Sequence, residues 1–262
     1  MPALLIFALT GAGAGALAGL FGVGGGLIMV PALAFVLPHL GVGPSITMQV
    51  AIGTSLAVIG TTSISSTLAH HRRGGVLWPV VRRIAPGLSV GAILGAFVAH
   101  SLSGFVLQRI VGGGAILVAL QMLLDRSHQA EGTLPGNASL FAAGSVIGLL
   151  SSLIGIGGGA LTVPLLSGYG VPMRNAVGTS AACGIPISWF GAATYMFAGA
   201  GAAGRAEASL GYVSLEAFAG IAVMSVLTAP FGAKLAHNLP QRALKRAFAL
   251  LLVLVGVSLL AK

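Results

Sequence analysis

Two stretches of ten residues decide how this chain folds: Gly22–Pro31 reads GVGGGLIMVP, and Gly155–Pro164 reads GIGGGALTVP. Both copies carry their glycines at the same positions, end in proline and lie inside long apolar runs. Each glycine weakens a helix by about 1 kcal/mol relative to alanine, so three in succession favour a break. The sequence therefore predicts two interrupted membrane helices at matching places in a duplicated chain, which is typical of a transporter binding site.

The composition indicates a membrane protein. Of the 262 residues, 56% are hydrophobic and 6% are charged, and the first Lys, Arg, Asp or Glu is Arg72. A soluble domain carries far more charge. Apolar runs such as 3–37, 90–107 and 244–260 approach or exceed the roughly 20 residues that cross a bilayer, and they lack the alternation of a β-barrel. We therefore predict an all-α polytopic membrane protein.

The duplication extends beyond the glycine breaks. Residues 48–55 (MQVAIGTS) are answered by 173–180 (MRNAVGTS), and 95–102 (GAFVAHSL) by 232–239 (GAKLAHNL). Each half contains five apolar pieces, which in the first half are 3–21, 26–38, 44–70, 78–100 and 104–124. We predict a first repeat over 1–125, a connecting loop over 126–137 and a second repeat over 138–262.

The second piece of each half is too short to cross the membrane alone, and this suggests an inverted repeat. Its 13 residues reach about 20 Å, against a core of about 30 Å. If the first two pieces form a re-entrant pair, three spans follow and the second half is turned over. Most basic residues then fall on one face, which the positive-inside rule makes cytoplasmic: Arg72, Arg73, Arg82, Arg83, Arg126, Arg174, Lys234, Arg242, Lys245 and Arg246. Ten full spans would give the same bias, so six and ten spans both stay open.

Several classes of function are disfavoured. The net charge of +9 comes from scattered basic residues without interleaved aromatics, so no nucleic-acid partner is expected. Cys183 is the only cysteine; it excludes an internal disulfide or a cysteine metal site and is interpreted as a small buried apolar residue. Glu216 is the only acidic residue within a span, near its end, which disfavours cation transport. We predict no catalytic residue, metal or cofactor.

The glycine breaks are the candidate binding site. Irregular backbone at membrane depth is tolerated only inside protein or beside a water-filled cavity, and a helix that starts there offers N–H groups and a positive dipole end to an anion. The alternative is that the glycines only permit close packing, as we expect for Gly11, Gly15 and Gly19. A phosphate-binding loop would need a lysine after the glycines, and none is present. The candidates are Gly22, Gly24, Gly25, Gly26, Gly155, Gly157, Gly158 and Gly159, with Pro31 and Pro164 in a structural role.

The repeated Gly-Thr-Ser triplets supply a second set of candidates. Thr54 and Ser55 in the first half and Thr179 and Ser180 in the second lie within apolar segments, where their hydroxyls can donate to an oxyanion. Hydrogen bonds to the helix backbone or between helices are the equally weighted alternative. Gln49 and Asn175 lie about one turn earlier and would add amide donors.

With its paired glycine breaks and downstream Gly-Thr-Ser triplets, the chain resembles the TauE/SafE family, the sulfite exporter family, over essentially its full length. The resemblance implies export or uptake of sulfite, thiosulfate, sulfoacetate or related organosulfonates across the inner membrane, with the lipid bilayer as the protein's surroundings. Among transport mechanisms we favour a carrier with alternating access or gates. A homo-oligomer stays open. An anion channel is the nearest alternative. An intramembrane hydrolase is less favoured because the histidines lie near the ends of the segments. A membrane scaffold without transport, which would tolerate side chains in the glycine breaks, is also less favoured.

Overall fold

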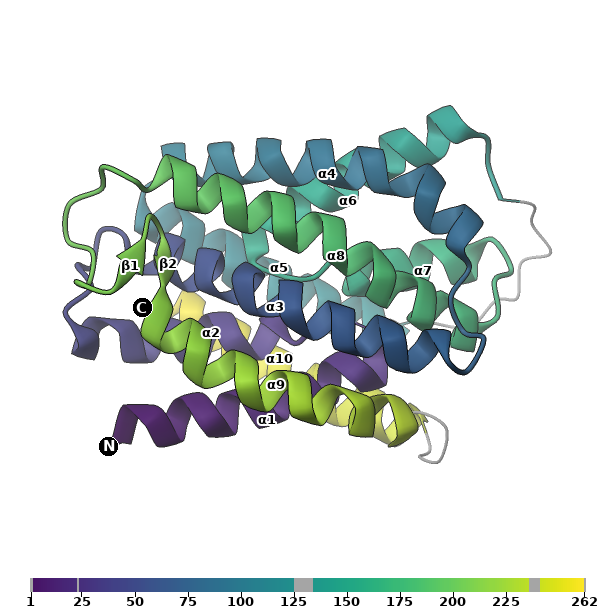
Figure 1. The fold of residues 1–262 in the computed structure, drawn as a ribbon, viewed down its shortest axis with the longest axis horizontal. Coiled ribbons are helices and arrows are strands. Elements are labelled where there is room, and N and C mark those ends of the chain that lie inside the picture. The colour runs from purple at the N-terminus through teal and green to yellow at the C-terminus, as the bar shows by residue number, and fades with distance from the viewer. Residues whose placement is uncertain (1, 23, 125–133, 236–240, 262) are drawn as a thin grey trace.

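The computed structural model describes residues 2–22, 24–124, 134–235 and 241–261, and these form a bundle of helices with one small hairpin (Figure 1). Val23, Arg126, Lys262 and most of the predicted connecting loop lie outside the described residues. The elements are α1 (Pro2–Phe21), α2 (Gly26–Val36), η1 (Leu37–Leu40), α3 (Thr47–His71), α4 (Trp78–Ser101), α5 (Gly104–Leu124), α6 (Asn137–Ile154), α7 (Gly159–Gly168), α8 (Met173–Ala198), β1 (Ser209–Leu210), β2 (Val213–Ser214), α9 (Leu215–Leu235) and α10 (Gln241–Leu260).

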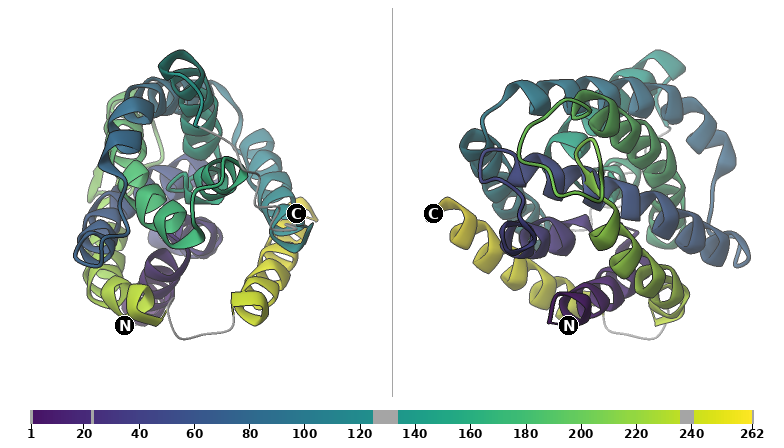
Figure 2. Two further views of the ribbon diagram at one scale, coloured as in Figure 1. Left: turned by 90° about the vertical axis from the view of Figure 1, so that its right-hand side faces the viewer. Right: turned by 60° about the vertical axis from the view of Figure 1, so that its left-hand side comes forward.

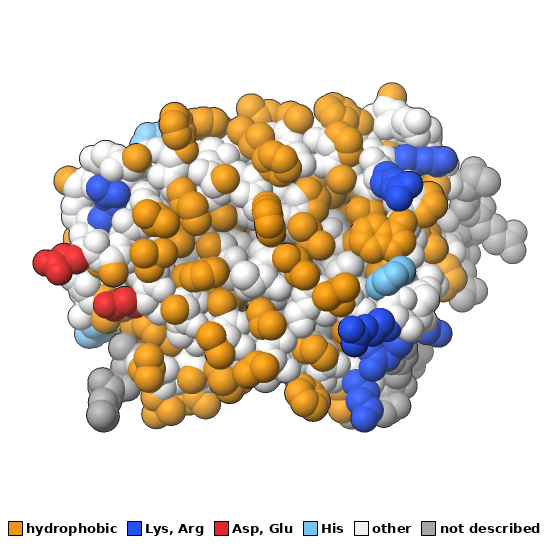
Figure 3. Space-filling view, in the orientation of Figure 1, with side chains coloured by type: hydrophobic (Ala, Val, Ile, Leu, Met, Phe, Trp, Pro, Cys, Tyr) orange, Lys and Arg blue, Asp and Glu red, His pale blue; other side chains and the backbone are white. Residues whose placement is uncertain are grey.

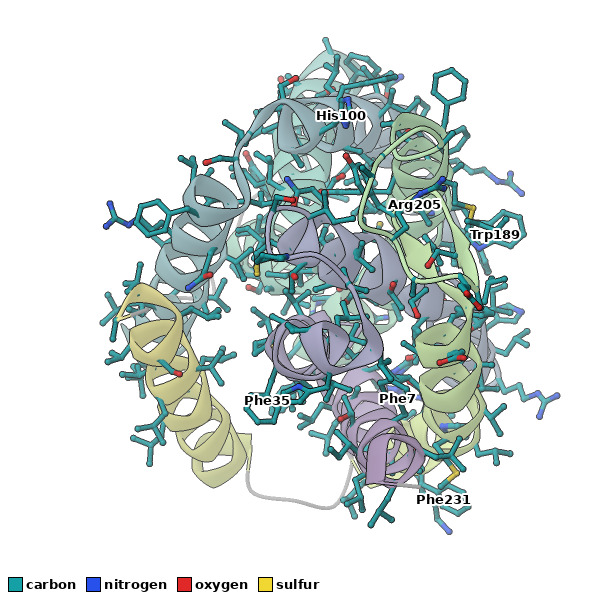
Figure 4. The ribbon with its side chains drawn as sticks, turned by 90° about the vertical axis from the view of Figure 1, so that its left-hand side faces the viewer. Phe7, Phe35, His100, Trp189, Arg205 and Phe231 are labelled. Carbon is teal, nitrogen blue, oxygen red and sulfur yellow. The ribbon has the colours of Figure 1, made fainter. Side chains whose placement is uncertain are left out.

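Seven helices of the described part are long and apolar enough to cross a membrane: α1, α3, α4, α5, α6, α8 and α9. Helices α2 and α7 have only 11 and 10 residues, so each is about 16 Å long and too short to cross alone. Large aromatic side chains such as Trp189 and Phe231 are exposed and point away from the bundle, whereas Phe35 lies on the side of α2 that faces α10 (Figure 4). The predictions of a polytopic α-helical protein and of short second pieces are confirmed.

The two halves of the chain pack into one another. Helix α1 packs against α9 and α4 against α6, while α3 packs against α8 and α5 against α10. If each helix is replaced by its counterpart in the other half, the same four pairs result. Figure 2 shows α5 and α10 along one side of the bundle and α1 with α9 along another. The halves are therefore not separate packing units, because the first helix of each lies against the fourth helix of the other.

Glycines set the close approach of these pairs. A Cβ on Gly11, Gly15 or Gly19 would come within 2.4 Å of a backbone oxygen of α9. Helix α4 meets α6 through glycines in the same way. Since apolar burial gives helices no preference for one another inside lipid, such small residues allow backbones to approach and pack. The packing role expected for these three glycines is confirmed.

Most of the basic side chains visible in Figure 3 lie at one end of the bundle, and the acidic ones lie at the other end beside a single basic group. The α3–α4 connection carries Arg72 and Arg73, and the Arg174 guanidinium at the start of α8 donates a hydrogen bond to the Arg73 carbonyl. We call this the basic end. The β1–β2 hairpin, preceded by Glu207, lies at the opposite end, which we call the hairpin end. A broad band of hydrophobic side chains separates them on the visible face.

Candidate functional site

The two glycine breaks meet inside the protein. A Cβ on Gly24 would lie 3.2 Å from the Cα of Gly157, and a Cβ on Gly26 would lie 2.1 Å from the carbonyl oxygen of Gly155. Backbone therefore lies against backbone with no side chain between them. All described residues of the two breaks are buried, so the structure brings together the two stretches that the sequence identified.

Both breaks require glycine for their backbone conformation as well as for space. The φ angles are +67° at Gly22, +78° at Gly24 and +75° at Gly25, and they are +77° at Gly155 and +75° at Gly158. In this left-handed region other residues lose about 1–2 kcal/mol. The positive φ angles end the first helix of each half and allow the short helix to begin immediately, at Gly26 and at Gly159.

The short helices begin with uncapped N-termini. Their N-cap residues, Gly25 and Gly158, make no side-chain capping bond, and neither first turn contains an acidic residue. The first N–H groups of a helix have no partner within it, and the dipole adds about half a positive charge at that end. Two such ends, starting from breaks in contact, form an electropositive junction without using any basic side chain.

The serines of the Gly-Thr-Ser triplets hold the breaks in place across the two halves. Ser55 Oγ donates to the carbonyl of Gly155 over 3.0 Å, and Ser180 Oγ donates to the carbonyl of Gly22 over 3.0 Å. Both serines are fully buried. Of the two roles left open by the sequence, these hydroxyls make backbone bonds here, and the backbone belongs to the break of the other half.

The threonines of the same triplets bind the starts of two long helices. Thr54 Oγ1 accepts from the N–H of Ser214, just before α9, and Thr179 Oγ1 accepts from the N–H of Leu77, just before α4, both over 3.0 Å. Each threonine is fully buried. Each of these bonds has an equivalent in which the two halves swap roles, as the two serine bonds also do. The duplication therefore extends to individual hydrogen bonds.

The two amide candidates are not brought to the breaks. Gln49 Nε2 donates to the carbonyl of Leu102, where α4 ends, over 2.9 Å, and Asn175 Nδ2 donates to the carbonyl of Gly74 over 3.3 Å. These carbonyls belong to connections at the two ends of the bundle. In this structure both amides therefore stabilise connections.

Related proteins cover nearly the whole chain. Residues 7–259 match the family described as sulfite exporter TauE/SafE. The chain belongs to this family. It is 36% identical over 260 residues to a probable membrane transporter protein of Haemophilus influenzae, covering 99% of this chain and 98% of the relative. A probable membrane transporter protein of Bacillus subtilis is 31% identical over 215 residues, with 74% and 79% covered. No solved structure matches the chain.

These names are those of membrane transporters and not of enzymes, as predicted. The prolines of this TauE/SafE transporter lie inside the short helices, Pro31 in α2 and Pro164 in α7. Proline removes one helical hydrogen bond, so each leaves a backbone carbonyl without its helical partner one turn earlier, close to the breaks. Cys183 is fully buried, as its interpretation as a small apolar residue predicted.

Sequence reasoning missed three hydroxyls beside the second break. Ser151 and Ser152 precede it and Thr162 follows it; each is at most 1% exposed, and none of the three hydroxyl oxygens has a hydrogen-bond partner in the described structure. The first half has no hydroxyl at the corresponding positions. These residues could have been selected from the sequence, because each is a polar residue near a glycine break in an otherwise apolar run. A cavity of about 250 Å³ between α5, α6 and α7 reaches Ser151.

Aromatic side chains cluster at the hairpin end. Tyr212 packs on Tyr195 with ring centroids 6.4 Å apart, and its hydroxyl lies 3.1 Å from Nδ1 of His100. Burial raises the pKa of the Tyr212 phenol, and the nearby Arg205 charge opposes this only in part. The phenol therefore stays protonated at neutral pH and keeps its hydrogen-bonding proton.

Proposed function

We propose that this TauE/SafE transporter carries small sulfur-containing anions, such as sulfite, thiosulfate or sulfoacetate, across the inner membrane. The anion binds where the two breaks meet, near the middle of the bilayer. The observation that carries the proposal is the contact between Gly24 and Gly157, from which two uncapped helices begin. Such helix ends are anion sites because their N–H groups and dipoles favour negative charge.

The proposed site binds its ligand mainly through backbone groups. N–H donors of the first turns of α2 and α7 would bind the anion oxygens, and charge-assisted bonds of this type are about twice as strong as neutral ones. Ser55 and Ser180 fix the shape of the site by holding one carbonyl of each break. The glycine backbones lie in contact in this structure, so a ligand of a few atoms binds between them only when the two breaks move apart.

We also propose that the two halves form an inverted repeat with the basic end in the cytoplasm. Support comes from the placement of equivalent elements: α1 begins at the hairpin end and α6 at the basic end (Figure 1). The arginines of the α3–α4 connection favour a cytoplasmic position by the positive-inside rule. Rocking of the halves around a fixed midplane site would then give alternating access.

Thermal unfolding in detergent tests the site. The purified protein is heated with sulfite, sulfate, thiosulfate, sulfoacetate, taurine or chloride, together with the variants Gly157→Leu and Gly13→Leu. Gly13 lies in open space and serves as the size-matched control. A ligand at 100 times its Kd stabilises the folded state by about 2.7 kcal/mol. We expect one sulfur oxyanion to raise the melting temperature of the parent and of Gly13→Leu, but not that of Gly157→Leu. No shift with any anion at millimolar concentration would contradict the proposed site.

A further inference from the structure

Two ring side chains occupy equivalent positions on either side of the breaks. His70 Nε2 donates to the carbonyl of Gly19 over 3.0 Å, and the Tyr195 hydroxyl donates to the carbonyl of Ser152 over 3.1 Å. His70 follows Ser55 by fifteen residues and Tyr195 follows Ser180 by fifteen. The acceptors also correspond, since each lies three residues before the first glycine of its break. Each ring therefore ties the third helix of its half to the first helix of the same half.

The two rings lie toward opposite ends of the bundle. His70 is in the last turn of α3, next to the α3–α4 connection of the basic end. Tyr195 is in the last turn of α8, in contact with Tyr212 of the hairpin end. Both side chains are buried, at 3% and 0% exposure. One ring thus lies near each end of the bundle.

Beside each ring lies a pair of buried hydroxyls with no partner in the described structure: Ser66 and Thr67 beside His70, and Ser151 and Ser152 beside Tyr195. None is more than 3% exposed. Ser66 and Thr67 lie one turn before His70 on the same face of α3. Ser152 carries its hydroxyl on the same residue whose backbone carbonyl accepts the hydrogen bond from Tyr195. Ser151 Oγ also lies 3.6 Å from the place where a Cβ on Gly158 would stand, so this pair reaches the second break.

Unpartnered hydroxyls are costly in a buried site, and one such pair beside each ring indicates groups that have partners in another state of the protein. The repeat does not require hydroxyls at these positions, because Gly191 and Ala192 correspond to Ser66 and Thr67, and Ala18 and Gly19 correspond to Ser151 and Ser152. Hydroxyls that donate to a small oxyanion or to its accompanying water fit positions along a path to the breaks.

We propose that Ser66 with Thr67 and Ser151 with Ser152 line two passages, one from each end, through which the anion reaches the glycine junction, and that His70 and Tyr195 close them. This inference rests on the proposed transport function. The ligand of both passages is a small hydrated oxyanion. When one ring releases its carbonyl, the hydroxyls beside it become accessible from that end alone, so each passage opens separately.

Single cysteines test the passages. In a Cys183→Ser background we place Ser66→Cys, Ser152→Cys or, as control, Ser188→Cys, and treat sealed inside-out and right-side-out vesicles with the anionic, membrane-impermeant reagent 2-sulfonatoethyl methanethiosulfonate. Ser188 is equally buried but donates within its own helix, to Gly184. We expect the cysteine at position 66 to react only from the basic end, the cysteine at 152 only from the hairpin end, and the control from neither.

Ring variants make the test specific. Tyr195→Phe removes only the hydroxyl and should speed labelling at position 152 about tenfold without changing position 66. His70→Ala should do the same at position 66, whereas His70→Gln, which keeps a donor, should stay near the parental rate. Labelling of both cysteines from the same end, or of neither, would overturn the two passages. Sulfite flux is measured in the same vesicles: flux with failed labelling overturns only the passages, and absent flux in the parent overturns the transport function and this inference together.

Discussion

At the scale of single residues, the Gly-Thr-Ser triplets show what this sequence reveals and what it conceals. Their position inside apolar segments and their repetition identified them as important polar groups. Their partners could not be predicted, because Ser55 binds a carbonyl 100 positions away along the chain and Ser180 binds one 158 positions away. In a membrane, a serine hydroxyl can bond to its own helix, to a neighbouring helix or to a ligand. Only the three-dimensional structure shows which of these partners it has.

Removing one of these serine hydroxyls should destabilise the protein. Ser55→Ala and Ser180→Ala each leave a glycine carbonyl unpaired in a buried place, so we expect a loss of about 1–2 kcal/mol, as for interhelical bonds in model peptides. Ser188→Ala is the matched control, since Gly184 and Ile185, the acceptors of Ser188, lie in its own helix. Chemical denaturation in mixed micelles measures the difference. Equal stability of all three variants would show that the cross-half bonds contribute nothing.

At the scale of elements, continuous apolar runs predicted the helices well because glycine breaks and polar connections limit them. The pieces predicted at 78–100 and 104–124 are α4 at Trp78–Ser101 and α5 at Gly104–Leu124. The β1–β2 hairpin was not predicted, since its strands have only two residues each. Which helices pack together was also not predicted, because nearly uniform apolarity inside lipid carries no pattern for choosing a partner.

Packing of α1 against α9 should depend on one face of α1. A Cβ on Gly15 would lie 2.2 Å from the carbonyl oxygen of Ser225, whereas Gly13 has nothing within 4 Å. Gly15→Ala therefore forces the helices apart, at a cost of about 1–3 kcal/mol. Gly13→Ala should be neutral or stabilising by up to about 1 kcal/mol, because alanine favours helix. Melting temperatures in detergent compare the two variants, and a more stable Gly15→Ala would contradict the packing.

At the scale of the whole molecule, the duplication organises packing, hydrogen bonds and charge together. The main helix pairs of the first half recur in the second, although Ser151 and Ser152 have no hydroxyl counterparts. The repeat itself was readable from two short motifs. The packing of the two halves against each other could not be predicted. An alignment of the halves shows which residues are equivalent, and it does not show which helices are in contact.

The proposed inversion predicts opposite sides for two equivalent connections. Arg72 lies in the connection after α3 and Gly201 in the connection after α8, and both are exposed. Cysteines at these positions, in a Cys183→Ser background, are treated in intact cells with an impermeant maleimide. We expect labelling at position 201 without permeabilisation and at position 72 only after it. Labelling of both from the same side would exclude an inverted repeat.

The most direct test of the central claim is uptake of radiolabelled sulfite and thiosulfate into proteoliposomes by the parent, Gly26→Val and Gly13→Val. A side chain at position 26 would meet the carbonyl of Gly155 and fill the junction of the breaks, whereas position 13 has room for one. The proposed site predicts saturable uptake with counterflow for the parent and for Gly13→Val, and no uptake for Gly26→Val that remains folded. Absence of uptake of either anion by the parent, or undiminished uptake by folded Gly26→Val, would contradict it.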